Sequence, residues 1–332
     1  MRDAAVDRLP VPGNHRGSAD RAHPHQSRPG GGHGAVLLRR RRPQCPYGQT
    51  SPAARPEGGP PVTADASRAP ETSENVENSE NSENSGIPAT SDASRWLVCE
   101  IPRPEARRRL VCFAHAGASA SFYRSWGRSL TEIEVHAVQY PGRANRFDEE
   151  PPDDLLRLAA GIADALEPLA DLPLSLFGHS LGAPVALETA RELQRRGIKI
   201  EHLFASGSCD APLPAPFVGD EDPDEILKDL VRMGGTEAEV VADPIFQEVV
   251  LPYLIADNRM FHTYEMAPEP RLGCPVTIIV GDLDEDADRR PWSALTTAPV
   301  HEAGVSGNHF YLVADPPYSI LREALSAPRP GS

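Results

Sequence analysis

The sequence predicts an α/β protein in which a mostly parallel sheet carries helices on both faces. Two observations carry this prediction. From Trp96 onward, short apolar runs alternate with helical patterns, which is typical of strand–helix–strand crossovers. Within this alternation, Gly178-His179-Ser180-Leu181-Gly182 joins a strand-like run to a helical pattern. A Gly-x-Ser-x-Gly turn in that setting holds its serine on a sharp strand-to-helix bend.

Seven apolar runs are the candidate strands, and three long helical patterns lie between them. Since a serine turn follows a middle strand, the α/β-hydrolase architecture fits the pattern best. The expected strands are 96–101, 110–114, 135–140, 174–177, 202–206, 276–280 and 300–303, and the expected helices are 122–130, 155–169 and 183–196.

One segment, about 210–268, interrupts the alternation with helical patterns at 224–233 and 244–264. This is longer than a crossover normally needs, so we expect a helical lid above the serine. Gly234-Gly235 separates the two patterns. We favour a helix stop at this pair, with a hinge as the alternative.

The chain has 332 residues, and its composition changes sharply near residue 95. Residues 1–95 lack apolar periodicity and contain a run of four arginines and an ENVENSENSENS repeat, so we expect a disordered tail. Its first part, 1–61, is rich in arginine, and we interpret it as an upstream extension with the true start near Val62. The expected catalytic domain is 96–326, and 327–332 is expected to be a disordered tail.

Charge and cysteine usage exclude several classes. The formal net charge is −15, which argues against nucleic-acid binding. The sequence lacks both an 18-residue apolar stretch and a secretory core, so we expect neither a membrane association nor export. Five scattered cysteines without C-x-x-C spacing argue against a zinc site and favour a reducing cytoplasm. We expect no metal and no cofactor.

Ser180 is the candidate nucleophile, and its partners must follow it in the chain in the order acid, then histidine. His309 comes directly after the last strand and is the candidate base. Asp284 follows the strand 276–280 and is the preferred acid, whose carboxylate would hold the imidazole tautomer. Asp282 and Asp286 are near alternatives, and Asp257 is a weaker one.

An oxyanion hole needs two backbone N–H groups where negative charge develops. We expect one from Leu181, directly after the nucleophile. We expect the second from Ala116, in the loop that follows strand 110–114.

Several longer motifs resemble the stand-alone type II thioesterases of polyketide and nonribosomal peptide synthesis. The resemblance covers essentially all of 110–325. Its motifs are CFAHAGASASFYRSW, QYPGRANRF, LFGHSLGAPVALETA, DPIFQEVVLPYLIADNRMFHTYE, CPVTIIVGDLDED and GNHFYL.

The resemblance implies hydrolysis of stalled or mis-primed acyl thioesters on the phosphopantetheine arm of acyl carrier or peptidyl carrier domains. It implies the same roles for Ser180, Asp284, His309, Ala116 and Leu181, through an acyl-serine intermediate. Further residues that we expect to contact the substrate are His115, Tyr253, His262 and Phe310.

Two other functions remain open from the sequence. The first is a small-molecule esterase or lipase with the same triad, and the second is a catalytically inactive binding protein of this fold. Carrier domains are usually acidic, as is this chain. We therefore expect a local basic patch, formed by Arg143, Arg146 and Arg259, to contact the carrier.

Overall fold

A computed structural model describes residues 92–216 and 222–326 of the chain. The expected tail up to residue 91, with its proposed extension 1–61, and the expected tail 327–332 lie outside the described residues. Within the two described ranges, no helix is both long and apolar enough to cross a bilayer.

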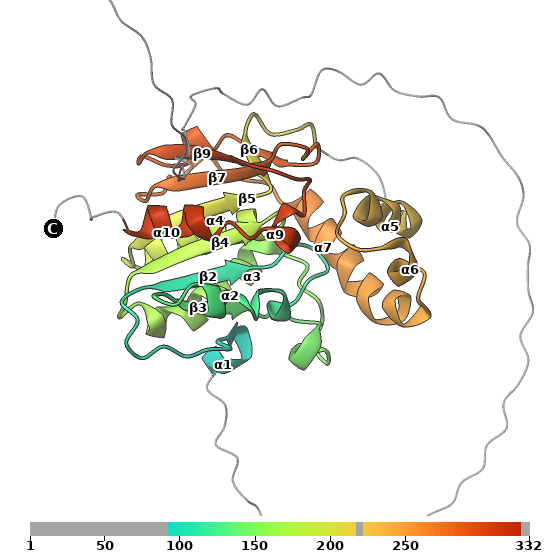
Figure 1. Ribbon diagram of the computed structural model, residues 1–332, viewed down its shortest axis with the longest axis horizontal. Coiled ribbons are helices and arrows are strands. Elements are labelled where there is room, and N and C mark those ends of the chain that lie inside the picture. Colours follow the sequence, from blue (N-terminus) through green and yellow to red (C-terminus); the bar gives the residue numbers. More distant parts are fainter. Residues whose placement is uncertain (1–91, 217–221, 327–332) are drawn as a thin grey trace, which may run out of the picture. The chain divides into compact units, whose positions relative to one another are not determined.

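Seven strands form one sheet in the order β1-β3-β2-β4-β5-β7-β9 (Figure 1). β1 is antiparallel to its neighbour, and all other pairs are parallel. Each of the seven expected strands has a counterpart in this sheet, the first of them much shorter than expected, which confirms a mostly parallel sheet. They are β1 (Leu97–Val98), β2 (Arg109–Phe113), β3 (Glu134–Val138), β4 (Leu174–His179), β5 (Ile200–Ser206), β7 (Val276–Gly281) and β9 (Val300–Val305).

The beginning of the domain differs from expectation. In place of a strand at 96–101, helix α1 (Asp92–Trp96) precedes a two-residue β1. The Arg146 guanidinium lies 3.9 Å from the centre of the Trp96 ring. A Cβ added at Gly161 would lie 2.9 Å from the same ring. Trp96 is therefore fixed by packing, and residues 92–95 belong to the folded part rather than to the tail.

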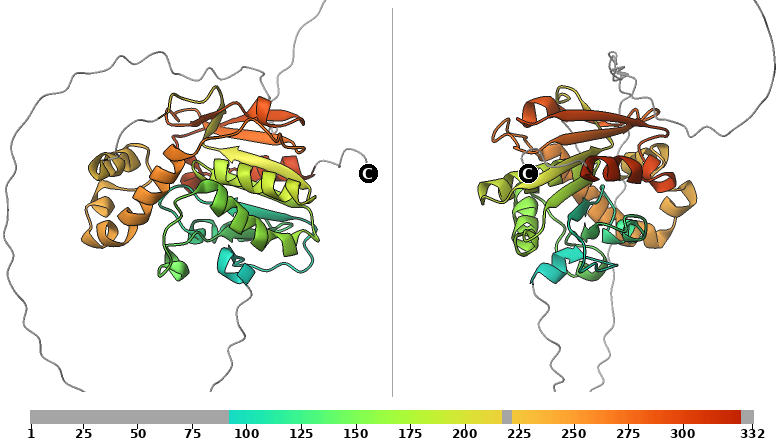
Figure 2. Two further views of the ribbon diagram at one scale, coloured as in Figure 1. Left: turned by 180° about the vertical axis from the view of Figure 1, so that it is seen from behind. Right: turned by 60° about the vertical axis from the view of Figure 1, so that its left-hand side comes forward.

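Helices cover both faces of the sheet. α3 (Leu155–Leu166) and α4 (Gly182–Arg195) lie on one face (Figure 2, left), and α2 (Trp126–Ser129), α9 (Tyr311–Ala314) and α10 (Tyr318–Ser326) lie on the other (Figure 1). α3 begins where the Asp154 side chain accepts a hydrogen bond from the Arg157 N–H at 2.9 Å, which satisfies a free donor of the first turn. The expected helix 155–169 ends in a 3₁₀ turn, Glu167–Leu169. The expected helix 122–130 is instead a 3₁₀ turn, Ala120–Tyr123, followed by α2.

The helical insertion, described for residues 211–216 and 222–268, lies beyond the carboxyl ends of the parallel strands (Figure 1). Its helices are α5 (Pro223–Arg232), α6 (Ala238–Val241) and α7 (Leu251–Thr263). The helix stop expected at Gly234 is confirmed, because Gly234 has φ +81° and the Gly235 N–H donates to the Leu230 carbonyl at 3.0 Å. This is the left-handed helix end that favours glycine.

The helix expected at 244–264 is not uniform. A π-helical turn, Phe246–Val250, leads into α7. Pro252 stands in the first turn of α7 and has no N–H to bond to the carbonyl four residues earlier. We attribute the wide turn to this missing bond, because a π turn changes the bonding partners locally without ending the helix.

A two-stranded sheet was not expected from the sequence. β6 (Ser208–Asp210) pairs in parallel with β8 (Asp288–Arg290). β6 lies at the start of the insertion, and β8 follows the acidic loop 282–286. The pairing therefore joins the entry of the insertion to the loop that carries the candidate acids.

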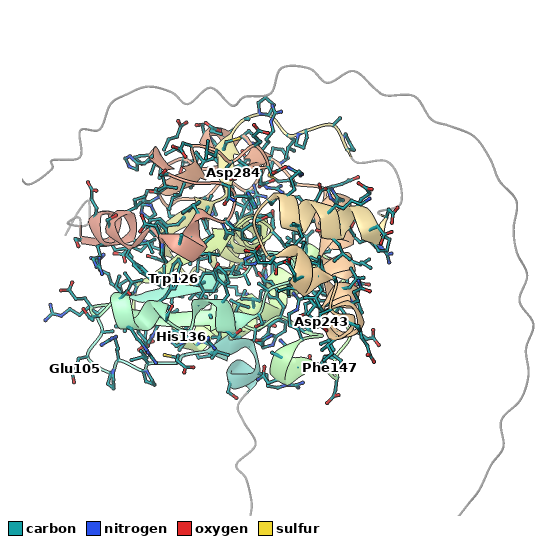
Figure 3. The ribbon with its side chains drawn as sticks, turned by 45° about the vertical axis from the view of Figure 1, so that its right-hand side comes forward. Glu105, Trp126, His136, Phe147, Asp243 and Asp284 are labelled. Atoms are coloured by element: carbon teal, nitrogen blue, oxygen red, sulfur yellow. The ribbon has the colours of Figure 1, made fainter. Side chains whose placement is uncertain are left out.

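Trp126 gives a test of the core on the α2 side of the sheet (Figure 3). It is 2% exposed and contacts the rings of Tyr123, Phe177 and Tyr318 edge-on. We expect Trp126→Ala to lower the free energy of unfolding by about 3–5 kcal/mol, because it leaves a cavity. Phe147→Ala removes a ring that is 56% exposed and should change it by about 0.5 kcal/mol or less. Urea unfolding of both variants measures this, and equal losses would contradict the packing role of Trp126.

Candidate active site

Ser180 stands at the bend between β4 and α4 with a φ of +53°. Few residues other than glycine adopt this region, and such strain often marks a functional site. A Cβ on Gly178 would lie 2.1 Å from the Gly182 carbonyl oxygen, and one on Gly182 would lie 2.2 Å from the Phe113 carbonyl oxygen. Both glycines are therefore required, because they let the start of α4 touch the neighbouring strands.

The loop after β9 brings His309 against Asp284, which follows β7. The His309 Nδ1 lies 3.0 Å from both carboxylate oxygens of Asp284. The side chains of His309 and Asp284 are 3% and 0% exposed. Because β7 and β9 are parallel neighbours, the loops that follow them meet at one edge of the sheet. An Nδ1–H that donates to the carboxylate leaves the Nε2 lone pair free to accept a proton.

The other three candidate acids have different partners. The Asp282 Oδ1 accepts a hydrogen bond from the Gly307 N–H at 2.8 Å. Asp286 forms an ion pair with Arg232, with an Nη1–Oδ2 distance of 2.8 Å. Asp257 is paired with Arg143. Of the four, Asp284 is the one in contact with His309.

Ala116 and Leu181 line the same cavity as Ser180. Leu181 directly precedes α4, and Ala116 lies in the turn after β2, which is hydrogen-bonded from the Ala118 N–H to the His115 carbonyl at 3.1 Å. Neither the Ala116 N–H nor the Leu181 N–H donates to another group in the described part of the chain. Both donors are thus available to a ligand, and the N-terminus of α4 adds a favourable field for an anion.

The cavity has a volume of about 770 Å³. Its floor is made by the residues around Ser180 and His309, together with His115 and Phe310. The helical insertion makes its roof, and we use the word roof for 211–216 and 222–268 from here on. The lining residues of the roof are Pro214, Asp222, Glu225, Ile226, Asp229, Leu230, Arg232, Met233, Leu254, Asn258, Phe261 and His262.

Of the four residues expected to contact substrate, three line this cavity. They are His115, His262 and Phe310. Tyr253 does not line it. Its ring lies 4.5 Å from the Arg143 guanidinium, so its placement is explained by Arg143 and not by the cavity.

The roof rests directly on the loop that carries His309. A Cβ on Gly234 would lie 2.4 Å from the Asn308 Nδ2, and one on Gly235 would lie 2.8 Å from the Phe310 ring. The Arg232–Asp286 pair joins α5 to the loop that carries Asp284. The end of α5 therefore contacts residues next to both His309 and Asp284.

A chain of hydrogen bonds lies behind the elbow, by which we mean the sharp bend at Ser180, and the sequence does not predict it. The Ser206 Oγ lies 2.9 Å from the His179 Nδ1 and 2.7 Å from the Tyr311 Oη. The rings of His179 and His309 are 5.0 Å apart. Ser206 is the last residue of β5, which pairs with β4 next to the elbow. Its position near Ser180 therefore follows from the order of the strands, but its hydrogen-bond partners do not.

Two histidines of this site are held neutral. Burial, with smaller effects of His309 and Arg143, lowers the pKa of His115 to about 3. Burial likewise lowers the pKa of His179 well below its usual value. His115 sits among three rings, those of Phe122, His179 and Phe310. These surroundings cannot solvate an imidazolium, which explains the direction of the shift.

One group in the described residues has the donor set of a metal site. The ligand atoms of Cys99, Glu134 and His136 lie within 4.8 Å of one another, on the β1–β3 side of the sheet. However, the Glu134 Oε2 that faces His136 also accepts from the Arg109 Nε at 2.8 Å. A guanidinium at this oxygen disfavours a divalent cation there, and none of the three residues lines the cavity.

The neutral histidines predict sensitivity to acid. An unfolded histidine gains its proton near pH 6.5, whereas folded His115 does so near pH 3. The unfolded state therefore binds more protons between these values, and stability falls as the pH is lowered through this window. His115→Phe should reduce the slope of unfolding free energy against pH between pH 5 and 6 by up to about 1.4 kcal/mol per pH unit.

Urea unfolding at pH 5, 6 and 7 measures this slope. Phe122→Leu is the control, because it removes a ring that contacts His115 but no titrating group. An unchanged slope in His115→Phe would show that His115 does not resist protonation in the fold.

The thioesterase domain family matches residues 108–326 of the chain. Among curated proteins, the chain is 38% identical over 231 residues to a probable cadicidin biosynthesis thioesterase of Streptomyces griseus, which covers 68% of this chain and 63% of that protein. It is also 38% identical over 233 residues to thioesterase PikA5 of Streptomyces venezuelae, which covers 68% of this chain and 83% of the relative.

Among solved structures, the type II thioesterase BorB of the borrelidin biosynthetic cluster is similar. The TM-score is 0.61 at 34% identity, over 70% of this chain and 98% of BorB. The sheet, the flanking helices and the elbow at Ser180 agree with this likeness. The chain therefore belongs to the thioesterase family and has the α/β-hydrolase fold of the type II thioesterases.

Proposed function

We propose that the protein is a type II thioesterase that hydrolyses aberrant or stalled acyl thioesters from carrier domains of a polyketide or nonribosomal peptide synthase. The single observation that carries the chemistry is that His309, which lines the same cavity as Ser180, contacts Asp284. Membership of the thioesterase family supports the thioester as the bond that is cleaved. The names of the relatives support the biosynthetic setting. We place the reaction in the cytoplasm, because the scattered cysteines favour a reducing compartment.

In the proposed mechanism, the Ser180 Oγ attacks the thioester carbonyl carbon while the His309 Nε2 takes its proton. Asp284 stabilises the imidazolium that forms, through the bond at Nδ1. The carbonyl oxygen becomes an oxyanion, which the free N–H groups of Ala116 and Leu181 stabilise. The C–S bond then breaks, and the proton passes from His309 to the pantetheine sulfur.

The acyl-serine is hydrolysed by the same groups in reverse roles. His309 takes a proton from water, the hydroxide adds to the acyl carbonyl, and the Ser180 Oγ leaves with that proton. The roof supplies apolar side chains against which the acyl chain would pack, and these are Ile226, Leu254 and Phe261 in the cavity lining. We therefore assign catalysis to 96–326 and substrate selection to the roof, which corresponds to the lid expected at about 210–268.

The carrier contact must differ from our expectation. Arg143 and Arg146 are 1% and 6% exposed, so they do not form a surface patch with Arg259. Arg143 is paired with Asp257 inside the protein. Arg146 is held between Glu149 and the Trp96 ring. Of the three arginines, only Arg259 is exposed and available to an acidic partner.

The proposal is tested with a set of acyl-loaded carrier proteins, acyl-pantetheine thioesters and free short esters. Ser180→Ala and His309→Ala should each lower kcat at least about 10³-fold, because the triad acts as a unit. Their melting temperatures should remain close to that of the parent. Hydrolysis of free esters alone would favour the small-molecule esterase. Equal slow turnover by parent and Ser180→Ala would favour the inactive binding protein.

Asp284 and Asp282 form a matched pair for the acid. Asp284→Asn should lower kcat about 10²- to 10⁴-fold, because an amide cannot stabilise the imidazolium. Asp282→Asn keeps an oxygen that can accept from the Gly307 N–H, so we expect less than about a tenfold loss. Steady-state kinetics on one acyl-pantetheine thioester decides between them, and a larger loss in Asp282→Asn would refute the assignment of the acid.

A further inference from the structure

A buried ion pair joins the roof to the turn after β3. The two guanidinium nitrogens of Arg143 each lie 2.6 Å from one carboxylate oxygen of Asp257. Their side chains are 1% and 0% exposed. Arg143 comes from the Pro-Gly-Arg turn after β3, and Asp257 lies on α7. The Coulomb attraction, together with two charge-assisted hydrogen bonds, raises the pKa of Arg143 despite burial.

Both members of the pair also hold the backbone of the loop that carries Ala116. The Gly117 N–H donates to the Asp257 Oδ2 at 2.9 Å. The Arg143 Nη1 donates to the Ala118 carbonyl at 3.2 Å. The loop is thus bonded at the two residues that follow Ala116, one by its donor and one by its acceptor.

α7 fixes the same loop sterically. A Cβ on Gly117 would lie 3.0 Å from the Leu254 Cδ1, and Leu254 lies three residues before Asp257 on α7. Gly117 has φ +77°, so the chain turns sharply there. Contact with Leu254 and the bond to Asp257 together fix the peptide plane between Ala116 and Gly117, because a planar peptide has no soft internal rotation. The Ala116 N–H belongs to the preceding peptide, whose His115 carbonyl accepts from the Ala118 N–H at 3.1 Å, so the turn carries the restraint to that N–H.

We propose that Arg143 and Asp257 are positioning residues, which aim the Ala116 N–H at the oxyanion by holding the loop from behind. The inference rests on the role proposed above for Ala116. A buried ion pair is often no more stabilising than apolar side chains of similar volume. The two hydrogen bonds within the pair and its two bonds to the loop give it a geometric role that apolar side chains cannot supply. A displacement of about 1 Å at such a donor costs on the order of 10²-fold in rate.

Two double variants separate the effect of loop position on kcat from the effect of the ion pair on folding stability. Arg143→Met with Asp257→Asn removes both charges but keeps an oxygen that accepts from the Gly117 N–H. Arg143→Met with Asp257→Leu removes both charges and that acceptor. We expect kcat on an acyl-pantetheine thioester to be about 10- to 100-fold lower in the second variant than in the first. KM should differ by less than about threefold, because ground-state binding is unchanged.

A second measurement is independent of the thioester substrate. A fluorophosphonate reacts with the Ser180 Oγ, so that an O–P bond forms, fluoride leaves and His309 takes the serine proton. Its phosphoryl oxygen needs the same donors, so labelling of Ser180 should slow by a similar factor in the second variant. If the parent is labelled but cleaves only free esters, the proposed substrate is wrong while the labelling ratio still decides the inference.

The outcomes are distinct. Equal kcat and equal labelling rates in the two double variants overturn the positioning role, as does a loss that follows the melting temperature. A parent that is not labelled at Ser180 also overturns it. If the second variant does not fold, Arg143→Lys replaces it, because an ammonium keeps the charge but lacks the planar fork that matches both carboxylate oxygens of Asp257. We then expect about a tenfold lower kcat at unchanged KM, and an unchanged kcat overturns the inference.

Discussion

The close contact between the start of α4 and the strand backbones is the constraint on which the site depends. The carbonyl oxygens of Gly182 and Phe113 occupy the space where side chains at Gly178 and Gly182 would begin. This contact turns the chain sharply enough to give Ser180 its positive φ. It also places the N-terminus of α4 and the loop after β2 beside the serine. The parallel order of β2, β4, β5, β7 and β9 then brings every other site loop to the same edge of the sheet.

The features that could be predicted from the sequence are local or follow from chain order. Apolar runs located all seven strands of the main sheet, although β1 covers only two residues of the expected 96–101. The elbow at Ser180 has a short signature. His309 could be placed because parallel strands bring the loops at their carboxyl ends together, so the loop after the last strand had to face the serine.

The features that could not be predicted depend on the direction of side chains or on distant partners. Asp282, Asp284 and Asp286 are equivalent in sequence, and the turn alone decides which carboxylate faces His309. An arginine in a loop is normally expected to be exposed, yet Arg143 is buried against Asp257. The sequence does not reveal this pairing, because Asp257 lies 114 residues later. Tyr253 is of a residue type that often contacts substrates, but its ring packs against the Arg143 guanidinium. The short β6–β8 pair has too few residues for a periodic signal.

The β6–β8 pair has a consequence for how such proteins change over evolution. It anchors the residues directly before the roof to the segment that follows Asp284, while β7 fixes the chain where it re-enters the sheet. The roof is thus a module with both ends tied to the catalytic framework. Substitutions, insertions and deletions between these ties would change the lining of the cavity. Changes at Arg232, Gly234 or Asp257 would also disturb the loops that carry Asp284, His309 and Ala116, because these three residues contact those loops directly.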